Sequence, residues 1–151
     1  MKTTLYISVL LGALLIPTRS ADVGDLQPIE VMMVSCENNL IRILTDTGDQ
    51  GSGGTVAEAM LNLCDTTSGI VYPDLAEFLI LDDGYESVVG ELDAWLKPNT
   101  KTCMADQEIE FQDVASFLNA HKPAATLREV ITGMKPEKLT QDEGKLTIKK
   151  D

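Results

Sequence analysis

Three cysteines and one histidine are the residues of this chain best suited to covalent or acid–base chemistry. They are Cys36, Cys64, Cys103 and His121, and their spacing matches neither a Cys-x-x-Cys redox motif nor a metal-binding Cys/His cluster. His121 falls near the expected end of a helix, where an imidazole interacts with the helix dipole, and no nucleophile elbow accompanies it. The sequence therefore predicts no catalytic residue and no metal site.

The cysteines are odd in number, so at most one bridge can form within the chain. Cys36 and Cys64 fall on apolar faces of two consecutive expected helices, and a bridge needs Cα atoms within ~4.4–6.8 Å. We expect an internal Cys36–Cys64 disulfide. Cys103 lies in a polar segment that reads as an exposed loop, so we expect it to link two chains as a homodimer or to carry a small-thiol cap. One competing interpretation pairs Cys103 with Cys36 or Cys64, and another leaves the odd cysteine buried as a free thiol.

A glycine-rich segment, Gly48–Thr55, has the glycine spacing of a phosphate-binding loop. Gly54 stands where the lysine of such a loop is needed, and Asp49 would repel a phosphate group. Read instead as a calcium loop that begins at Asp46, the segment places Ala57 at the final bidentate position. Both interpretations fail, so the sequence predicts a flexible polar loop and no cofactor.

The first 20 residues have the layout of a secretory signal. Lys2 gives a basic start, Leu5–Ile16 is mainly apolar, and the small residues Thr18 and Ser20 precede Ala21. An ordinary membrane span needs about 20 apolar residues, which is more than this run provides. We expect cleavage after Ser20, a secreted extracellular protein and no membrane span.

The chain is acidic, with 24 aspartates and glutamates against 12 lysines and arginines and a net charge of −12. The expected leader carries Lys2 and Arg19 and no acid, so the mature chain has 10 basic and 24 acidic residues, a net charge of −14. Nucleic acids and anionic membranes both need a basic surface. The charge therefore argues against nucleic acid as a partner.

Apolar residues recur at helical spacing through most of the chain, and Gly, Pro and capping residues separate the periodic segments. Thr55 with Glu58, for example, forms a capping-box signature, and Thr126 is placed to cap the last short helix. Alternating runs of β-branched residues are nearly absent. The pattern predicts an all-α fold, a compact bundle of five or six short helices after a cleaved signal peptide, at about 28–45, 55–64, 73–79, 83–97, 106–122 and 126–132.

One domain is expected because the mature chain is short. We expect the helical domain to occupy residues 21–133 and residues 134–151 to form a flexible charged C-terminal tail, since that segment is charged and poorly periodic. The expected core includes Leu92, Trp95, Val114 and Leu118.

These features favour a small secreted acidic protein that acts by binding a partner, as venom, seminal-fluid or host-directed proteins do, and not as an enzyme. The alternative is a carrier of a small apolar ligand held between helices. It rests on methionine and aromatic residues expected on inner faces, because such side chains adapt to irregular ligands: Met32, Met33, Met60, Phe78, Trp95, Phe111 and Phe117. A ligand-binding residue cannot be assigned from the sequence.

Overall fold

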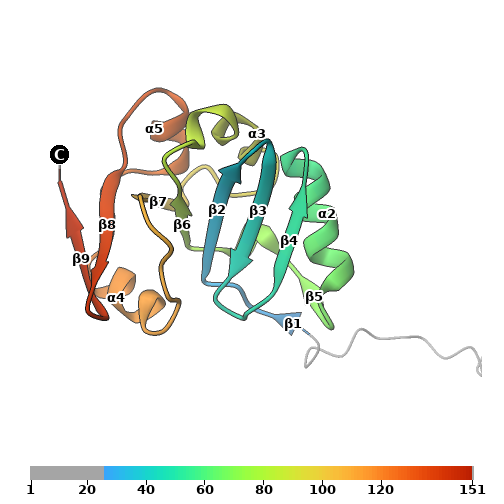
Figure 1. Cartoon of the computed structure of the whole chain (residues 1–151), viewed down its shortest axis with the longest axis horizontal. Coiled ribbons are helices and arrows are strands. Elements are labelled where there is room, and N and C mark those ends of the chain that lie inside the picture. The colour runs from blue at the N-terminus through green and yellow to red at the C-terminus, as the bar shows by residue number, and fades with distance from the viewer. Residues whose placement is uncertain (1–25, 151) are drawn as a thin grey trace, which may run out of the picture.

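The computed structural model describes residues 26–150, and the expected signal peptide and its cleavage site lie outside them. Seven strands form one mixed sheet in the order β4-β3-β2-β6-β7-β8-β9 (Figure 1). Their bounds are β2 Val31–Glu37, β3 Leu40–Thr45, β4 Gln50–Gly53, β6 Phe78–Leu81, β7 Lys101–Ala105, β8 Glu137–Asp142 and β9 Lys145–Lys149. A separate two-stranded parallel pair joins β1 (Leu26–Gln27) and β5 (Ile70–Val71).

The middle of the sheet is parallel, and both ends are antiparallel. Strands β2, β6, β7 and β8 run in the same direction. β3 and β4 continue from β2 as antiparallel neighbours, and β9 returns antiparallel to β8. β4 and β9 are therefore the two edge strands.

Helices cover the two faces of the sheet unequally. One face, called the helix-rich face below, packs against α2 (Val56–Thr66), α3 (Val89–Leu92) and α5 (Leu127–Ile131). The other face packs against α4 (Val114–Ala120) and is called the α4 face. Short 3-10 turns occupy Pro73–Leu75 and Tyr85–Ser87. Figure 1 shows α2 beside β4 at one end of the sheet and α4 beside the β8–β9 hairpin at the other.

The expected all-α bundle is wrong, and the first expected helix, 28–45, shows why. It is a β-hairpin in which β2 and β3 pair from Met32–Thr45 to Glu37–Leu40. Asn38 and Asn39 form its two-residue turn with φ values of 53° and 62°, the left-handed conformation that such hairpin turns need and that asparagine tolerates. Apolar residues fill both sides of β2, so their spacing fitted a helix as well as a buried strand.

The C-terminal segment also differs from the expected flexible tail. β8 and β9 form a second hairpin, closed by Glu143 (φ 49°) and Gly144 (φ 79°). Leu139 and Leu146 from this hairpin are buried on the α4 face. The folded domain therefore includes residues 137–149.

The expected helix 73–79 contains a 3-10 turn and part of β6, and α4 begins at Val114 rather than near Asp106. Two local expectations are confirmed. Thr55 caps α2 by accepting a hydrogen bond from the Glu58 amide, and Thr126 caps α5 in a complete capping box with Glu129. Expected core residues Leu92, Val114 and Leu118 are fully buried, and Trp95 is partly buried.

No helix within residues 26–150 combines the length and the apolarity needed to cross a membrane.

Candidate functional site

The three cysteines are free in the structure, so the expected Cys36–Cys64 disulfide is wrong. Cys36 is in β2 rather than on a helix, and its sulfur lies 4.0 Å from the hydroxyl of Ser87. Cys64 is exposed on α2. The expected bridge required Cys36 and Cys64 to lie on two neighbouring helices. Residues 28–45 form a β-hairpin instead, so that arrangement does not exist.

Cys103 is not an exposed loop thiol. It lies in the interior strand β7 with 0% of its surface exposed, so it cannot reach a second chain or a small thiol in the folded state. Burial, with a smaller contribution from the charge of Glu137, raises the pKa of Cys103 to about 12. Burial and then the charge of Asp65 also raise the pKa of Cys64. Since the thiolate is the nucleophile, neither residue is an activated nucleophile.

His121 is at the C-terminal cap of α4, as its position near an expected helix end indicated. Its ring stacks on Phe117 with centroids 4.6 Å apart, and its Nδ1 lies 3.2 Å from the Phe117 carbonyl oxygen. These contacts are with an aromatic ring and a main-chain oxygen, whereas a histidine base needs an oriented partner and a nucleophile within reach. These contacts hold His121 at the end of α4, and they do not orient it as a catalytic base.

Carboxylates gather where the parallel strands end, around a hollow of about 390 Å³. The Asp82 carboxylate accepts hydrogen bonds from the amides of Cys36 (2.6 Å) and Gly84 (3.1 Å), and Asp106 forms an ion pair with Lys138 (2.6 Å). Ligands of open parallel sheets bind where the strand order reverses, and the order β4-β3-β2-β6-β7-β8-β9 reverses between β2 and β6, at the strand ends that border this hollow. Residues 26–150 contain no group of acidic, histidine or cysteine side chains placed to hold a metal ion. Asp82 and Asp106 already have main-chain and lysine partners, and these contacts brace the loops around the hollow.

The glycine-rich segment forms β4 and lies directly under α2. A Cβ atom on Gly51 would be 2.3 Å from the Ala59 carbonyl oxygen and 2.5 Å from the Leu63 amide nitrogen. A Cβ on Gly53 would be 2.5 Å from the Glu58 Cβ. These glycines permit the close approach of strand and helix, which is a packing reason for their spacing.

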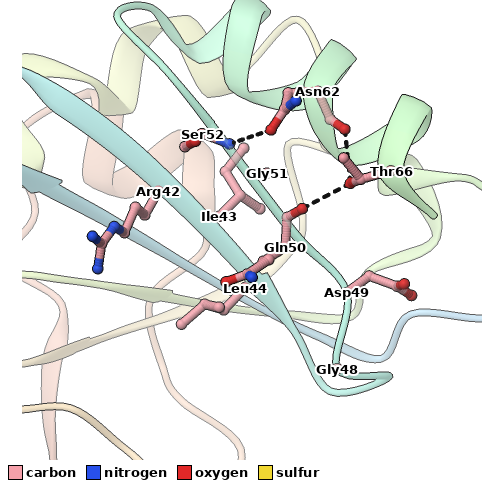
Figure 2. A pocket seen from close by; sticks show the side chains of 10 residues that line it. All are labelled: Arg42, Ile43, Leu44, Gly48, Asp49, Gln50, Gly51, Ser52, Asn62 and Thr66. Atoms are coloured by element: carbon pink, nitrogen blue, oxygen red, sulfur yellow. Dashed lines mark hydrogen bonds between the residues drawn. The ribbon is translucent and has the colours of Figure 1, made fainter.

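Side chains of α2 cover the outer main chain of β4 (Figure 2). The Ser52 amide donates to the Asn62 side-chain oxygen at 3.0 Å, and the Thr66 hydroxyl donates to the Gln50 carbonyl at 2.9 Å. An edge strand otherwise presents unpaired groups that can join another strand. The hollow of about 560 Å³ at this edge is thus bordered by main-chain groups that already have partners.

The opposite edge strand, β9, borders an apolar groove on its side toward α4. The groove is about 730 Å³ in volume, and its apolar walls are Phe117 from α4 and Leu146 and Ile148 from β9. Its other lining residues are Asp113, Ser116, His121, Gly144, Lys145 and Thr147. Leu146 is buried, whereas Phe117 and Ile148 remain partly exposed. An apolar surface of this kind suits apolar side chains.

Two hydrogen bonds fix how α4 lies along the hairpin. The Glu110 amide, before α4, donates to the Gln141 side chain at 2.9 Å, and the Ala124 amide, after α4, donates to Glu137 at 2.8 Å. α4 therefore runs opposite to β8 and in the same direction as β9. The groove between α4 and β9 is consequently long and parallel to the strand.

The pairing of β8 with β9 determines which main-chain groups face outward. Asp142 and Lys145 flank the two-residue turn, and the paired residues continue through Gln141–Leu146 and Thr140–Thr147. In an antiparallel pair closed by such a turn, alternate residues point their N–H and C=O groups away from the neighbouring strand. At β9 these are Leu146 and Ile148, the same residues whose side chains line the groove.

Sequence reasoning missed this site because it assigned residues 134–151 to a tail. The run Lys145–Lys149 alternates charged or polar with apolar side chains, which is the period of a half-buried strand. That signal covers only five residues and needed the turn at Glu143–Gly144 to be recognised with it.

Comparison of this chain with family models, with curated proteins and with solved structures finds no match.

Proposed function

We propose that this chain is a secreted binding protein that accepts an extended segment of a protein partner along β9. The observation that carries the proposal is the open main chain of β9 beside an apolar groove. Strand addition to a sheet edge uses main-chain hydrogen bonds for affinity and pockets for alternate side chains for specificity. At β9, Leu146 and Ile148 would supply the main-chain groups, and the groove would accept the side chains.

The contrast with β4 supports the choice of edge. Asn62 and Thr66 occupy the outer main chain of β4, so a partner would have to displace two hydrogen bonds there. Within residues 26–150, no side chain forms a hydrogen bond with the outward main-chain groups of β9 as Asn62 and Thr66 do at β4. Binding at β9 therefore carries a smaller cost.

The carrier alternative loses part of its support, although Phe117 borders the groove beside β9. Met32, Met60 and Phe78, which suggested a pliable ligand site, are at most 1% exposed and fill the core beneath the helices. They contribute to the free energy of folding in the way that ordinary core side chains do. Binding without catalysis is the function that the remaining surface supports best.

The main-chain mechanism can be tested by replacing Ile148 with proline. Proline has no N–H group, and it is tolerated on an edge strand where that group points outward. Heptapeptides would first be selected from a displayed random library on the wild-type protein. Their binding should then fall about tenfold in Ile148→Pro, the value of one or two lost hydrogen bonds. Binding should change little in the control Ile148→Val.

Amide hydrogen exchange locates the bound peptide. We expect the selected peptides to protect the amides of Leu146 and Ile148, and the melting temperature of Ile148→Pro would show that the variant is folded. Semisynthesis with N-methylated Ile148 removes the same donor and keeps the side chain, which covers the case in which proline disturbs folding. A library that yields no binder, or binders that protect residues outside β9, would contradict the proposal.

Secretion is supported by the leader-like residues 1–20. Expression of the full chain in a secretory host should release a protein whose first residue is Ala21. Edman sequencing of the medium fraction checks this, and recovery of a secreted chain that still begins at Met1 would contradict it.

A further inference from the structure

Two lysines alternate with the groove-facing residues of the open edge, and Lys145 also borders the end of the groove beside the turn. Lys145 and Lys149 are exposed and four residues apart, and Leu146 and Ile148 between them face the α4 side. Because side chains alternate along a strand, the two lysines share the helix-rich face of β9 with Thr147. Residues 145–150 contain three lysines and no acid, in a chain where acids outnumber bases 24 to 12.

Neighbouring charges leave these two lysines available. The ion pairs described within residues 26–150 join Lys138 to Asp106 at 2.6 Å and Lys150 to Glu137 at 3.8 Å. Lys138 lies directly opposite Lys149 across the hairpin. Asp106 balances that like-charge pair in part, but it is engaged with Lys138. Asp142 stands directly opposite Lys145 across the hairpin, yet neither Lys145 nor Lys149 belongs to an ion pair within residues 26–150.

Resting on the function proposed above, we propose that the segment accepted by β9 is a partner's extended strand with two chemically different faces. Acidic side chains stand opposite Lys145 and Lys149, and apolar side chains stand opposite Leu146 and Ile148 and enter the groove beside Phe117. Directly opposed residues on neighbouring strands have Cβ atoms about 5 Å apart, which is within reach of a lysine and a glutamate. The fitting pattern is acidic–apolar–any–apolar–acidic.

A second copy of this chain fits the edge less well. Antiparallel pairing of two β9 strands about Thr147 would set each Lys145 against a Lys149 of the other copy. It would also bring together two molecules that each carry a net charge of −14 once the expected leader is removed. Lysines on an exposed edge disfavour such self-pairing. The same lysines attract an acidic strand, so charge selects the partner's chemistry.

Three synthetic peptides test the two-faced pattern. The acidic probe contains Glu-Val-Thr-Val-Glu between Gly-Ser flanks, and the basic probe replaces both glutamates with lysines. The scrambled probe, Glu-Glu-Thr-Val-Val, keeps the composition and charge of the acidic probe but has no alternation. Titration of the full-length secreted protein is followed by NMR shifts and by exchange of the Leu146 and Ile148 amides, at low and at high ionic strength.

We expect the acidic probe to bind about tenfold more tightly than the basic probe, since two edge ion pairs contribute modestly and salt weakens them. The scrambled probe should bind more weakly than the acidic probe. In the double variant Lys145→Glu/Lys149→Glu the order of the two charged probes should reverse. The control Arg42→Glu/Lys97→Glu changes net charge equally at exposed sites outside β8 and β9, and it should keep the wild-type order.

The outcomes separate this inference from the function on which it rests. If acidic and basic probes protect Leu146 and Ile148 equally, strand addition stands and the acidic preference is wrong. If no probe protects these amides, strand addition itself is contradicted. Concentration-dependent protection of β9 without any peptide, together with dimers in sedimentation velocity, would make a second copy the occupant and would overturn the inference.

Discussion

The two edge strands of the sheet, β4 and β9, differ in whether their outer main-chain groups are covered. At β4, glycines bring α2 so close that Asn62 and Thr66 pair with the outer main chain. At β9, α4 stands to one side, the main chain stays open and lysines occupy the edge. An edge strand must be covered or made unattractive to other strands. The contrast indicates that β4 is closed for stability and that β9 is selective.

The difference also lies in what each helix contacts. α2 packs on β4 through main-chain and Cβ contacts of Ala59 and Leu63. α4 packs through Val114 and Leu118, which are buried on the α4 face, and leaves Phe117 partly exposed beside β9. Because Val114 and Leu118 anchor α4 on the sheet and Phe117 does not, a groove remains between α4 and β9. The position of the neighbouring helix therefore decides whether the main chain of an edge strand is open to a partner.

The largest effect is expected where α4 is anchored. Leu118→Ala removes a fully buried side chain and should lower the free energy of unfolding by about 2–5 kcal/mol. It should also weaken peptide binding at β9, because one wall of the groove is displaced. Urea unfolding measures the first effect. The matched control Leu61→Ala alters an α2 residue that is 57% exposed and should change stability little; equal losses in both variants would contradict the described packing.

A methyl group on Gly51 would break the contact that closes the other edge. Gly51→Ala should destabilise the protein by about 1–3 kcal/mol, since the new Cβ overlaps main-chain atoms of α2 that cannot move independently. Gly90→Ala is the control, because that glycine is helical and a Cβ there meets nothing within 4 Å. The control should stabilise slightly. Thermal melting compares them, and a Gly51→Ala variant as stable as wild type would disprove the close approach.

Removing the Asn62 side chain should expose the Ser52 amide of β4 to water without unfolding the protein. Asn62→Ala leaves the Ser52 amide to water and should cost about 1 kcal/mol. Exchange of the Ser52 amide should accelerate, while the Leu146 and Ile148 amides keep their wild-type rates. The control Asp65→Ala changes an exposed neighbour on α2. Unchanged exchange at Ser52 would show that Asn62 does not cover this edge.

The smallest effect concerns the charge balance beside β9. The hydrogen bond from Lys138 lowers the pKa of Asp106; partial burial opposes this shift, and a main-chain hydrogen bond and the charges of Lys138 and Lys149 add smaller lowering effects. The folded state therefore favours the ionised carboxylate, and its contribution to stability is present above about pH 4 and is lost as the pH falls further. Asp106→Asn should slightly flatten the acid side of the stability profile, and Asp93→Asn should not. Identical profiles for wild type and Asp106→Asn would contradict the ion pair.

Short sequence patterns correctly predicted the features that depend on neighbouring residues, namely helix caps and some buried positions. Thr55 and Thr126 cap α2 and α5 because a hydroxyl three residues before a glutamate satisfies amides within a single turn. Leu92 and Leu118 are buried as their periodicity indicated. Burial alone does not distinguish a helix from a strand, so the same apolar spacing led to a helix at 28–45 where Asn38 and Asn39 make a hairpin.

The amino-acid sequence by itself determined the acidic charge, the caps of α2 and α5 and many of the apolar residues that are buried, but neither hairpin was recognised from it. Tertiary structure alone decided that Cys103 is in an interior strand, that Gly51 lies under α2 and that β9 is an open edge. These features depend on pairing between residues far apart in the chain, such as Cys103 with Ile80 and Glu137. Strand order and helix placement follow from the packing of the whole sheet, which no short window of sequence contains.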